Sequence, residues 1–336
     1  MTDTHSPDAP LKCAIAGCGG IARVHLDAMK NIPDIEPAAC LDADIAAAQQ
    51  MAAQAGCPAF DDLDKMLDCV PLDCLIVSTP PAFHADIACK VLDRGIHVLC
   101  EKPVAINLAQ AQTMAAAAQK NGVRLIPAFC HRFAASSAKM RDMILQDSIG
   151  SPALVNILFC GDGSGLAGRW FSNRALSGGG VIMDTLVHSI DLFHYLAGYA
   201  VEVHCTATCG ILGLDVEDTA LVNLKSPDGV IGDLFGSWAT PSGCARIEIM
   251  GSKGTLFFDY NIPDILVWRR SGMGEEHISI PSASERFTNQ LRHFAGLVRG
   301  RAAAPVISER DAVESMRVAE ECMTAAIKTA PAGSKA

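Results

Sequence analysis

The feature that most constrains this chain is a glycine-rich loop between a short apolar strand and a helix. The strand expected over residues 12–16 runs directly into G-C-G-G-I-A at 17–22, and a helical segment follows. This matches G-x-G-x-x-A: the first glycine permits a tight turn, the second lets backbone approach a pyrophosphate, and the small last residue allows close helix–strand packing. The helix N-terminus adds amide donors and a favourable dipole. The pattern predicts a dinucleotide site formed by Gly17, Gly19, Gly20, Ile21 and Ala22.

An acidic residue follows the second strand at the distance this motif requires. The strand expected over 36–41 ends at Asp42, twenty residues after Ala22. There a carboxylate accepts hydrogen bonds from the adenosine ribose. Ala43 and Asp44 come next, with no arginine or lysine to pair with a 2′-phosphate, so NAD is favoured over NADP. The alternative is that Asp42 simply caps the next helix, which its position also suits.

Apolar strands and helices continue to alternate up to residue 129. Strands are expected over 73–77, 97–100 and 124–129, and their near-continuous apolar character is typical of a parallel sheet covered on both faces. We therefore predict an α/β Rossmann domain, a doubly wound parallel sheet, over residues 11–130. Ligands gather beyond the carboxyl ends of such strands, where this chain carries Ser78, Thr79, Pro80, Glu101 and Lys102. For Lys102 the alternative is an exposed charge that only solubilises the strand end.

The second half has a different pattern. Six strands are expected between residues 201 and 268, with hairpin turns at 226–229 and 251–254. They predict an α+β domain over residues 131–336 with a large open, mainly antiparallel sheet. Helices on one side would leave the other face available for a homo-oligomer, a dimer or tetramer. Two late helices are expected to be capped by Ser282 with Glu285 and by Ser308 with Asp311.

A triple glycine at 178–180 precedes an apolar segment with helical periodicity. On one stripe of this helix lie Asp184, His188, Asp191 and Tyr195. Acidic and imidazole groups on a buried helix are costly unless something partners them. Asp184 could therefore pair with His188 across one turn, or both could face a cavity and handle a substrate. The glycines, which let backbone come close to a ligand, favour the second interpretation.

Composition excludes several classes of function. The chain has 336 residues, enough for two domains, and a formal net charge of −10 without any basic block. Nucleic acid and anionic membrane are therefore not expected as partners. The first ten residues lack the features of a signal peptide and no apolar run reaches spanning length, so we expect a soluble, cytoplasmic protein. The fourteen cysteines form no C-x-x-C and lie largely in apolar runs, so neither disulfides nor a metal is expected.

Four motifs together resemble the Gfo/Idh/MocA family of NAD(P)-dependent oxidoreductases, which act mainly on sugars and cyclitols. They are G-C-G-G-I-A at 17–22, S-T-P-P-A-F-H at 78–84, E-K-P at 101–103 and G-G-G-V-I-M-D-T-L-V-H-S-I-D at 178–191. The resemblance extends from about residue 11 to residue 329. It implies that Lys102, Asp184 and His188 form the catalytic group. It also implies that the nicotinamide half of the cofactor is bordered by Ser78, Thr79, Pro80, His84 and Glu101.

The chain departs from the family pattern at two places. Leu186 replaces the glycine of the D-x-G-x-H that many members show, and helix geometry points Leu186 away from Asp184 and His188. The segment 130–133, C-H-R-F, differs where members often carry an asparagine or a second arginine, which bears on substrate identity. The substrate is expected to contact Arg132, Arg169, Trp170 and Asn173, with the tryptophan stacking on a sugar or only anchoring its loop.

The expected reaction is hydride transfer between NAD and a secondary hydroxyl of a sugar, cyclitol or sugar derivative. His188 would serve as acid/base, because imidazole titrates near neutral pH. Lys102 would polarise the reacting oxygen, and Asp184 would orient the imidazole or hold a second hydroxyl. The reverse roles of Lys102 and His188 are equally compatible with the sequence. One alternative is a non-enzymatic dinucleotide- or sugar-binding regulator, which would tend to lack Lys102 or His188. Another is a glycoside-cleaving enzyme that oxidises one carbon transiently and recycles NAD.

Overall fold

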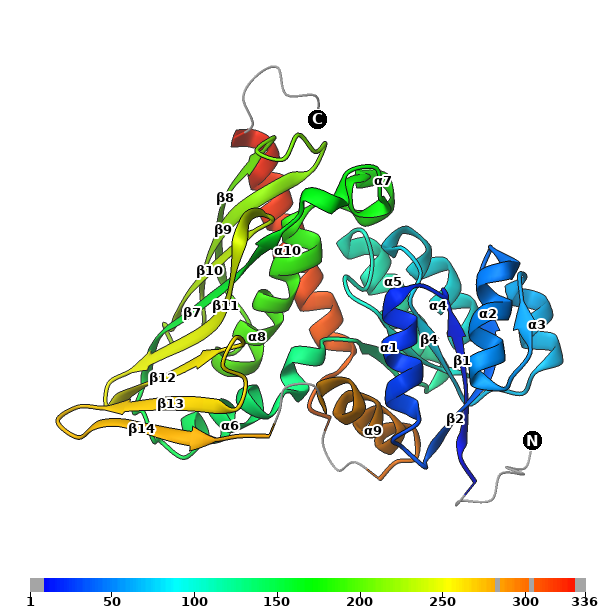
Figure 1. The fold of residues 1–336 in the computed structure, drawn as a ribbon, viewed down its shortest axis with the longest axis horizontal. Coiled ribbons are helices and arrows are strands. Elements are labelled where there is room, and N and C mark those ends of the chain that lie inside the picture. Colours follow the sequence, from blue (N-terminus) through cyan, green and yellow to red (C-terminus); the bar gives the residue numbers. More distant parts are fainter. Residues whose placement is uncertain (1–8, 282–284, 302–304, 330–336) are drawn as a thin grey trace. The chain divides into compact units, whose positions relative to one another are not determined.

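The computed structural model describes residues 9–281, 285–301 and 305–329 (Figure 1). The chain divides into two compact units. The first contains the N-terminal part up to Ala105, Ala109–Ala128 and Phe287–Ala312, and the second contains Ile106–Leu108, Phe129–Arg286 and the part from Val313 onward. The expected boundary placed residues 131–336 in one domain, whereas in the structure the chain returns to the first unit over Phe287–Ala312. Helix α9, Arg286–Val298, packs almost entirely within the first unit.

The first unit is built on a six-stranded sheet in the order β3-β2-β1-β4-β5-β6. Every pairing is parallel, and this confirms the predicted doubly wound sheet. The order changes direction between β1 and β4, so the crevice for a ligand lies beyond the carboxyl ends of those two strands. The strands are β1 Leu11–Ala16, β2 Ile35–Leu41, β3 Ala59–Phe60, β4 Cys74–Val77, β5 His97–Cys100 and β6 Leu125–Pro127.

Helices cover this sheet because its strands are apolar on both faces; all four residues of β4 are buried. The helices that accompany this sheet, besides α9, are α1 Gly20–Met29, α2 Ile45–Ala55, α3 Leu63–Cys69, α4 His84–Asp93 and α5 Leu108–Asn121. Short η1, Pro81–Phe83, leads directly into α4.

The second unit contains an eight-stranded sheet in the order β14-β13-β12-β11-β7-β10-β9-β8. All pairings are antiparallel except that of β10 with β7, so the prediction of a mainly antiparallel sheet is confirmed. Its strands are β7 Pro152–Asp162, β8 Glu202–Cys209, β9 Glu217–Lys225, β10 Ile231–Ser237, β11 Ala239–Gly251, β12 Gly254–Asp259, β13 Ile265–Arg270 and β14 Gly274–Ser279. The sequence did not reveal β14, an exposed edge strand without apolar alternation.

The segment after the triple glycine is helical but not uniformly so. A π-helical turn, η5 Ile182–Leu186, continues into α8, Val187–Ala197. This helix packs closely on β10 through two glycines: a Cβ at Gly236 would lie 2.7 Å from Leu186 Cγ, and one at Gly232 would lie 2.8 Å from Phe193 Cδ2. Leu186 is therefore a core residue, as helix geometry predicts. The other helices of this unit are α6 Ala135–Leu145, α7 Arg174–Ser177 and most of α10 Glu309–Thr329, joined by short η2 Cys130–Phe133, η3 Ser164–Leu166 and η4 Trp170–Ser172.

One of the two predicted helix caps can be checked. The Asp311 carboxylate accepts hydrogen bonds from the Ser308 backbone N–H (2.7 Å) and hydroxyl (2.9 Å) at the start of α10. The other pair cannot be followed, because Ser282 lies outside the described residues. No helix in the described ranges has the length and apolar character needed to cross a membrane. All fourteen cysteines lie in those ranges and none forms a disulfide.

Candidate active site

The glycine loop has the geometry of a dinucleotide cradle. Gly17 has φ of +90°, and a Cβ there would lie 2.6 Å from the backbone of Ser78 and Thr79, so only glycine fits. A Cβ at Gly19 or Gly20 would meet nothing within 4 Å. Gly19 is also the N-cap of α1 and offers no side chain to the first-turn N–H groups. Open space and uncapped amides therefore meet at one point, where a phosphate would fit.

Asp42 ties the end of β2 to this loop. Its Oδ2 accepts the Cys18 backbone N–H at 2.7 Å, and its Oδ1 accepts that of Asp44 at 2.9 Å. Helix α2 is capped by Asp44 instead, whose Oδ1 accepts the Ala46 N–H at 3.0 Å. The interpretation of Asp42 as an ordinary helix cap is therefore wrong. Its half-buried carboxylate stands beside the loop, where a ribose hydroxyl could reach it.

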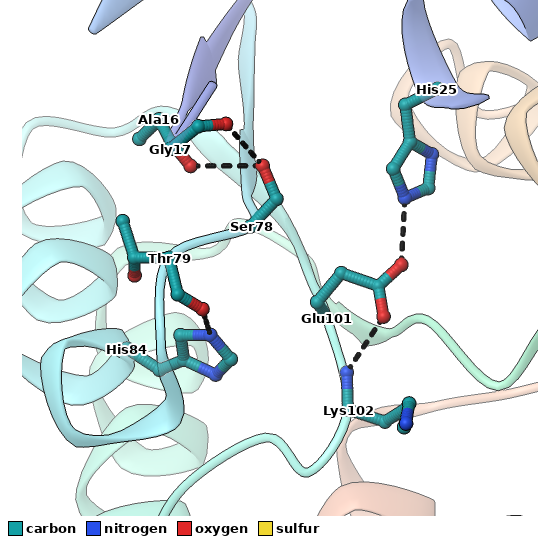
Figure 2. Close-up of polar contacts among 8 residues, drawn as sticks. All are labelled: Ala16, Gly17, His25, Ser78, Thr79, His84, Glu101 and Lys102. Carbon is teal, nitrogen blue, oxygen red and sulfur yellow. Dashed lines mark hydrogen bonds and ion pairs between the residues drawn. The ribbon is translucent and has the colours of Figure 1, made fainter. Parts of the chain in front are cut away.

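Ser78, which follows β4, contacts the backbone of the glycine loop (Figure 2). The Ser78 hydroxyl lies within hydrogen-bonding distance of two carbonyl oxygens, those of Ala16 (3.0 Å) and Gly17 (2.8 Å). Ser78 is 9% exposed, so the side chain supports the turn, while Thr79 and Pro80 remain half-buried. The structure therefore shows Ser78 supporting the glycine loop, and its place beside the cofactor stays a prediction.

His84 has a similar supporting role. It is completely buried, with Nε2 2.7 Å from the Thr79 carbonyl oxygen and Nδ1 3.0 Å from that of Pro103. Burial lowers the pKa of His84, and the neutral ring donates to one of these carbonyls at a time. His84 therefore links the backbones that follow β4 and β5, and its place beside the nicotinamide stays a prediction.

Glu101 is held by a residue that the sequence did not reveal. Glu101 Oε1 lies 2.8 Å from Nε2 of His25 on α1, and its Oε2 accepts the Lys102 backbone N–H at 3.1 Å (Figure 2). His25 is fully buried and Glu101 is 6% exposed. The available signal was that His25 follows Ala22 by three residues and shares its buried helix face. The carboxylate thus fixes the backbone from which the half-buried Lys102 extends.

In the second unit, Asp184 lies in η5 and His188 in α8. Both are half-buried, whereas Ile182, Leu186 and Val187 between and around them are buried. The π-helical turn places a widened backbone at the carboxylate, a feature that recurs at functional sites. Gly180 is required just before it, because a Cβ there would lie 2.0 Å from the Glu217 carbonyl oxygen.

His188 sits in an aromatic environment. Its ring centroid lies 4.7 Å from that of His131 and 6.2 Å from that of Phe129, both edge to face. His131 Nδ1 is 2.7 Å from the Tyr260 hydroxyl, and burial raises the pKa of Tyr260, which keeps the phenol protonated. The sequence does not predict that His131 and Tyr260 meet, because the two residues are 129 positions apart.

Arg132 does not occupy the position predicted for a substrate residue. It is 4% exposed, and its Nε lies 3.0 and 2.9 Å from the two carboxylate oxygens of Asp191 on α8. The guanidinium also lies over the ring of Tyr195, 5.3 Å from its centroid. A buried carboxylate requires such a partner, so Arg132 holds η2 to α8 and is withdrawn from substrate contact.

The other three predicted substrate residues come together. Arg169, Trp170 and Asn173 line one hollow of about 710 Å³ in the second unit, together with Arg174 and Asp215. Trp170 stacks on Phe171 with ring centroids 3.7 Å apart, and Arg169 lies over the Phe171 ring. Asn173 Oδ1 caps α7 by accepting the Ala175 N–H at 3.0 Å. The hollow therefore combines an aromatic face with polar and charged groups.

The expected catalytic group draws on both units. Lys102 belongs to the first unit, and Asp184 and His188 belong to the second. Among the described residues, no group of three His, Cys, Asp or Glu side chains is placed to hold a metal ion.

Two family models match the chain in succession. The model described as an oxidoreductase family with an NAD-binding Rossmann fold, GFO/IDH/MocA, matches residues 11–129. The model of the GFO/IDH/MocA C-terminal domain matches residues 137–257. Together the two models span more than half of the chain and cover both units.

Individual relatives share about a third or less of their residues with this chain. The D-glucoside 3-dehydrogenase of Escherichia coli (strain K12) is 33% identical over 197 residues, which cover 57% of this chain and 55% of the relative. The scyllo-inositol 2-dehydrogenase (NAD(+)) of Bacillus subtilis (strain 168) is 26% identical over 326 residues, 92% of each chain. Among solved structures, a levoglucosan dehydrogenase in complex with NADH and levoglucosan superposes with a TM-score of 0.87 at 20% identity, over 95% of this chain and 97% of that one.

Proposed function

This chain belongs to the GFO/IDH/MocA oxidoreductase family, and from that membership we propose that it is an NAD-dependent dehydrogenase of a sugar, cyclitol or sugar derivative. The proposed reaction moves a hydride between a secondary hydroxyl carbon and the nicotinamide. Relatives whose names specify glucoside and inositol dehydrogenases support the class of substrate.

The observation that carries the proposal is the arrangement of the glycine loop. Gly17 is locked against the backbone after β4, Gly19 faces open space, and Asp42 anchors the loop from the side. We assign the pyrophosphate to the amides at the start of α1 and the adenosine ribose to Asp42. Asp44 beside it adds a second negative charge, which opposes a 2′-phosphate and supports NAD over NADP.

Three side chains are assigned to the chemistry. When bound, the nicotinamide supplies the hydride acceptor. Lys102 holds its ammonium toward the reacting oxygen and stabilises negative charge there, His188 takes the hydroxyl proton, and Asp184 orients the substrate or the imidazole. Figure 2 shows how Glu101 fixes the backbone of Lys102, because its Oε2 accepts the Lys102 N–H at 3.1 Å.

The hollow around Trp170 is proposed as part of the substrate site. An indole offers a flat apolar surface on which the C–H face of a pyranose or cyclitol ring packs. Arg169 and the Asn173 amide can then donate hydrogen bonds to ring hydroxyls, and Asp215 can accept them. This mixture suits a neutral polyol better than an apolar alcohol.

The outer face of the large sheet is proposed to bind a second copy of the chain. Leu158, Phe235 and Leu221 lie side by side on β7, β10 and β9 and are half-buried, whereas their neighbours Ile157, Leu234 and Val222 are buried against the helices. This three-residue apolar row on the outer face of the sheet supports a contact with a second copy. Light scattering should find an oligomer, and Phe235→Glu should shift it towards the monomer.

The direct test follows absorbance of reduced nicotinamide during incubation with NAD and a panel of polyols. The panel contains D-glucosides, levoglucosan, and myo- and scyllo-inositol. Lys102→Met should abolish turnover and leave NAD binding intact, while Lys90→Met on the exposed face of α4 serves as the matched control. Turnover retained in Lys102→Met would remove the assignment of Lys102.

A further inference from the structure

Two imidazoles meet edge to face in the second unit. The ring of His188 on α8 lies 4.7 Å from that of His131 on η2, centroid to centroid, with an angle of 71° between the planes. We propose that His131, held by Tyr260, is a positioning residue that sets the protonation state of His188. This inference deepens the proposed function, because it rests on His188 being the acid/base.

His131 is fixed from two sides. Its Nδ1 lies 2.7 Å from the hydroxyl of Tyr260, which follows β12, and its ring packs at 5.2 Å on Phe159 of β7. Phe159 and Tyr260 are themselves in contact, with ring centroids 5.6 Å apart. A half-buried imidazole on a short η2 turn is thereby held by two strands of the large sheet, and its distance from His188 is set by the fold.

The Tyr260 hydroxyl can pair with either protonation state of His131. Because burial keeps the phenol protonated, its O–H can donate to Nδ1 of a neutral ring, which then carries its hydrogen on Nε2. When His131 gains a proton, Nδ1–H donates and the phenol oxygen accepts. The phenol therefore holds the His131 ring in place in both protonation states. A carboxylate in the same position would instead favour the protonated ring.

Two protons on this pair are opposed by electrostatic repulsion. Imidazolium charges at a separation near 5 Å repel each other even through water, so the first proton weakens binding of the second by a factor of a few. Such a pair titrates as a unit. His131 in this way favours an unprotonated His188, the form that can accept a proton from a hydroxyl group.

Other charges act on the same cluster. Asp184 precedes His188 by four residues across the junction of η5 and α8, and a carboxylate near an imidazole would favour its protonated form, opposite to the effect of His131. Arg286 lowers and Cys130 raises the pKa of Tyr260, while burial outweighs both. These groups remain in the His131 variants below, so a change between variants reports on residue 131.

The test is a titration of the histidine Cε1–H signals by NMR in the full-length protein. Replacing His131 by Asn retains a side chain that can bind the Tyr260 hydroxyl and removes the titrating ring. Where His131 shares the proton with His188, the midpoint of His188 should then rise, by about half a pH unit for repulsion through water alone. His277→Asn, on the exposed edge strand β14, is the matched control and should leave His188 unchanged.

His131→Arg and Tyr260→Phe complete the design. Arginine keeps a positive charge at every pH, so His188 should titrate at or below its wild-type midpoint, opposite to His131→Asn. Tyr260→Phe keeps the aromatic packing and releases the His131 ring, and should give a smaller upward shift. If His188 titrates identically in wild type, His131→Asn and His131→Arg, the proposal is overturned.

Activity gives a second readout that separates this proposal from the proposed function. In His131→Asn the acid limb of the kcat/KM profile should move to higher pH, because His188 keeps its proton longer. In His131→Arg it should stay or move lower. An absence of dehydrogenase activity would overturn the proposed function but leave the NMR result to decide the His131–His188 coupling.

Discussion

His25 and Glu101 form a buried contact, Nε2 to Oε1 at 2.8 Å, between the helix that follows the glycine loop and the strand end that precedes Lys102 (Figure 2). The second carboxylate oxygen accepts the Lys102 N–H. The two halves of the expected nicotinamide site in the first unit, the loop and the E-K-P segment, are therefore joined by one imidazole–carboxylate pair. A change at His25 should affect both.

Replacing His25 by Leu leaves a buried carboxylate without its partner. We expect the free energy of unfolding to fall by about 3 kcal/mol in urea denaturation, with weaker NAD binding in the surviving native protein. The control is Lys30→Ala, which removes the exposed pair with Asp27 and should cost less than about 0.5 kcal/mol. Equal stability of the two variants would contradict a structural role of the contact.

Gly17 and Gly19 should respond differently to alanine. At Gly17 the new Cβ would meet backbone at 2.6 Å at a φ of +90°, so Gly17→Ala should lower the stability of the ligand-free protein by about 2 to 3 kcal/mol. At Gly19 the new Cβ would meet nothing within 4 Å, so stability should be unchanged and only NAD binding should weaken. Calorimetry of NAD binding, with unfolding measured in parallel, checks both. Unchanged NAD affinity in Gly19→Ala would argue against a phosphate at this point.

Asp42 and Asp44 should separate cofactor choice from helix capping. Asp42→Ala should weaken NAD binding and narrow the preference for NAD over NADP, because the acceptor for the ribose hydroxyls is lost. Asp44→Ala should lower stability by about 1 kcal/mol through loss of the α2 cap. The ratio of NAD to NADP dissociation constants should change less in Asp44→Ala than in Asp42→Ala, because only a charge that opposes the 2′-phosphate is lost and the ribose acceptor remains. A ratio unaffected by Asp42→Ala would place the ribose elsewhere.

His84 should make stability depend on pH. Burial lowers the pKa of His84 below its ordinary value of 6.5, so the unfolded chain binds the proton more tightly than the folded one. The stability that this residue contributes is complete above pH 6.5 and is lost as pH falls from there towards the lowered pKa. In that window the free energy of unfolding of the wild type should fall by up to about 1.4 kcal/mol per pH unit more than that of His84→Gln. Parallel stability curves for the two proteins would show that His84 does not titrate on unfolding.

Much of the fold could be predicted because its elements depend on patterns of residues that are close in sequence. The strand, glycine loop and helix from residue 11 to residue 29 are adjacent in sequence, and each has its own periodicity or turn residue. The Ser308–Asp311 cap is equally local. Edge strand β14 was missed because an exposed strand buries no alternate residues and therefore lacks the pattern.

What local patterns could not reveal is the choice of distant partners. Arg132 and Asp191 are 59 residues apart, and His25 and Glu101 are 76 apart. A buried charge signals only that some partner exists, so Arg132 looked as suitable for a substrate as for a carboxylate. The same holds for His131, whose neighbours Tyr260 and His188 come from other elements.

The most direct test of the account follows the hydride itself. The protein is incubated with NAD and polyols carrying deuterium on their ring carbons, and the recovered nicotinamide cofactor is weighed by mass spectrometry. We predict reduced cofactor that is one mass unit heavier, with the matching ketone as product. Cofactor that binds but is recovered unlabelled and oxidised with every polyol of the panel would contradict it.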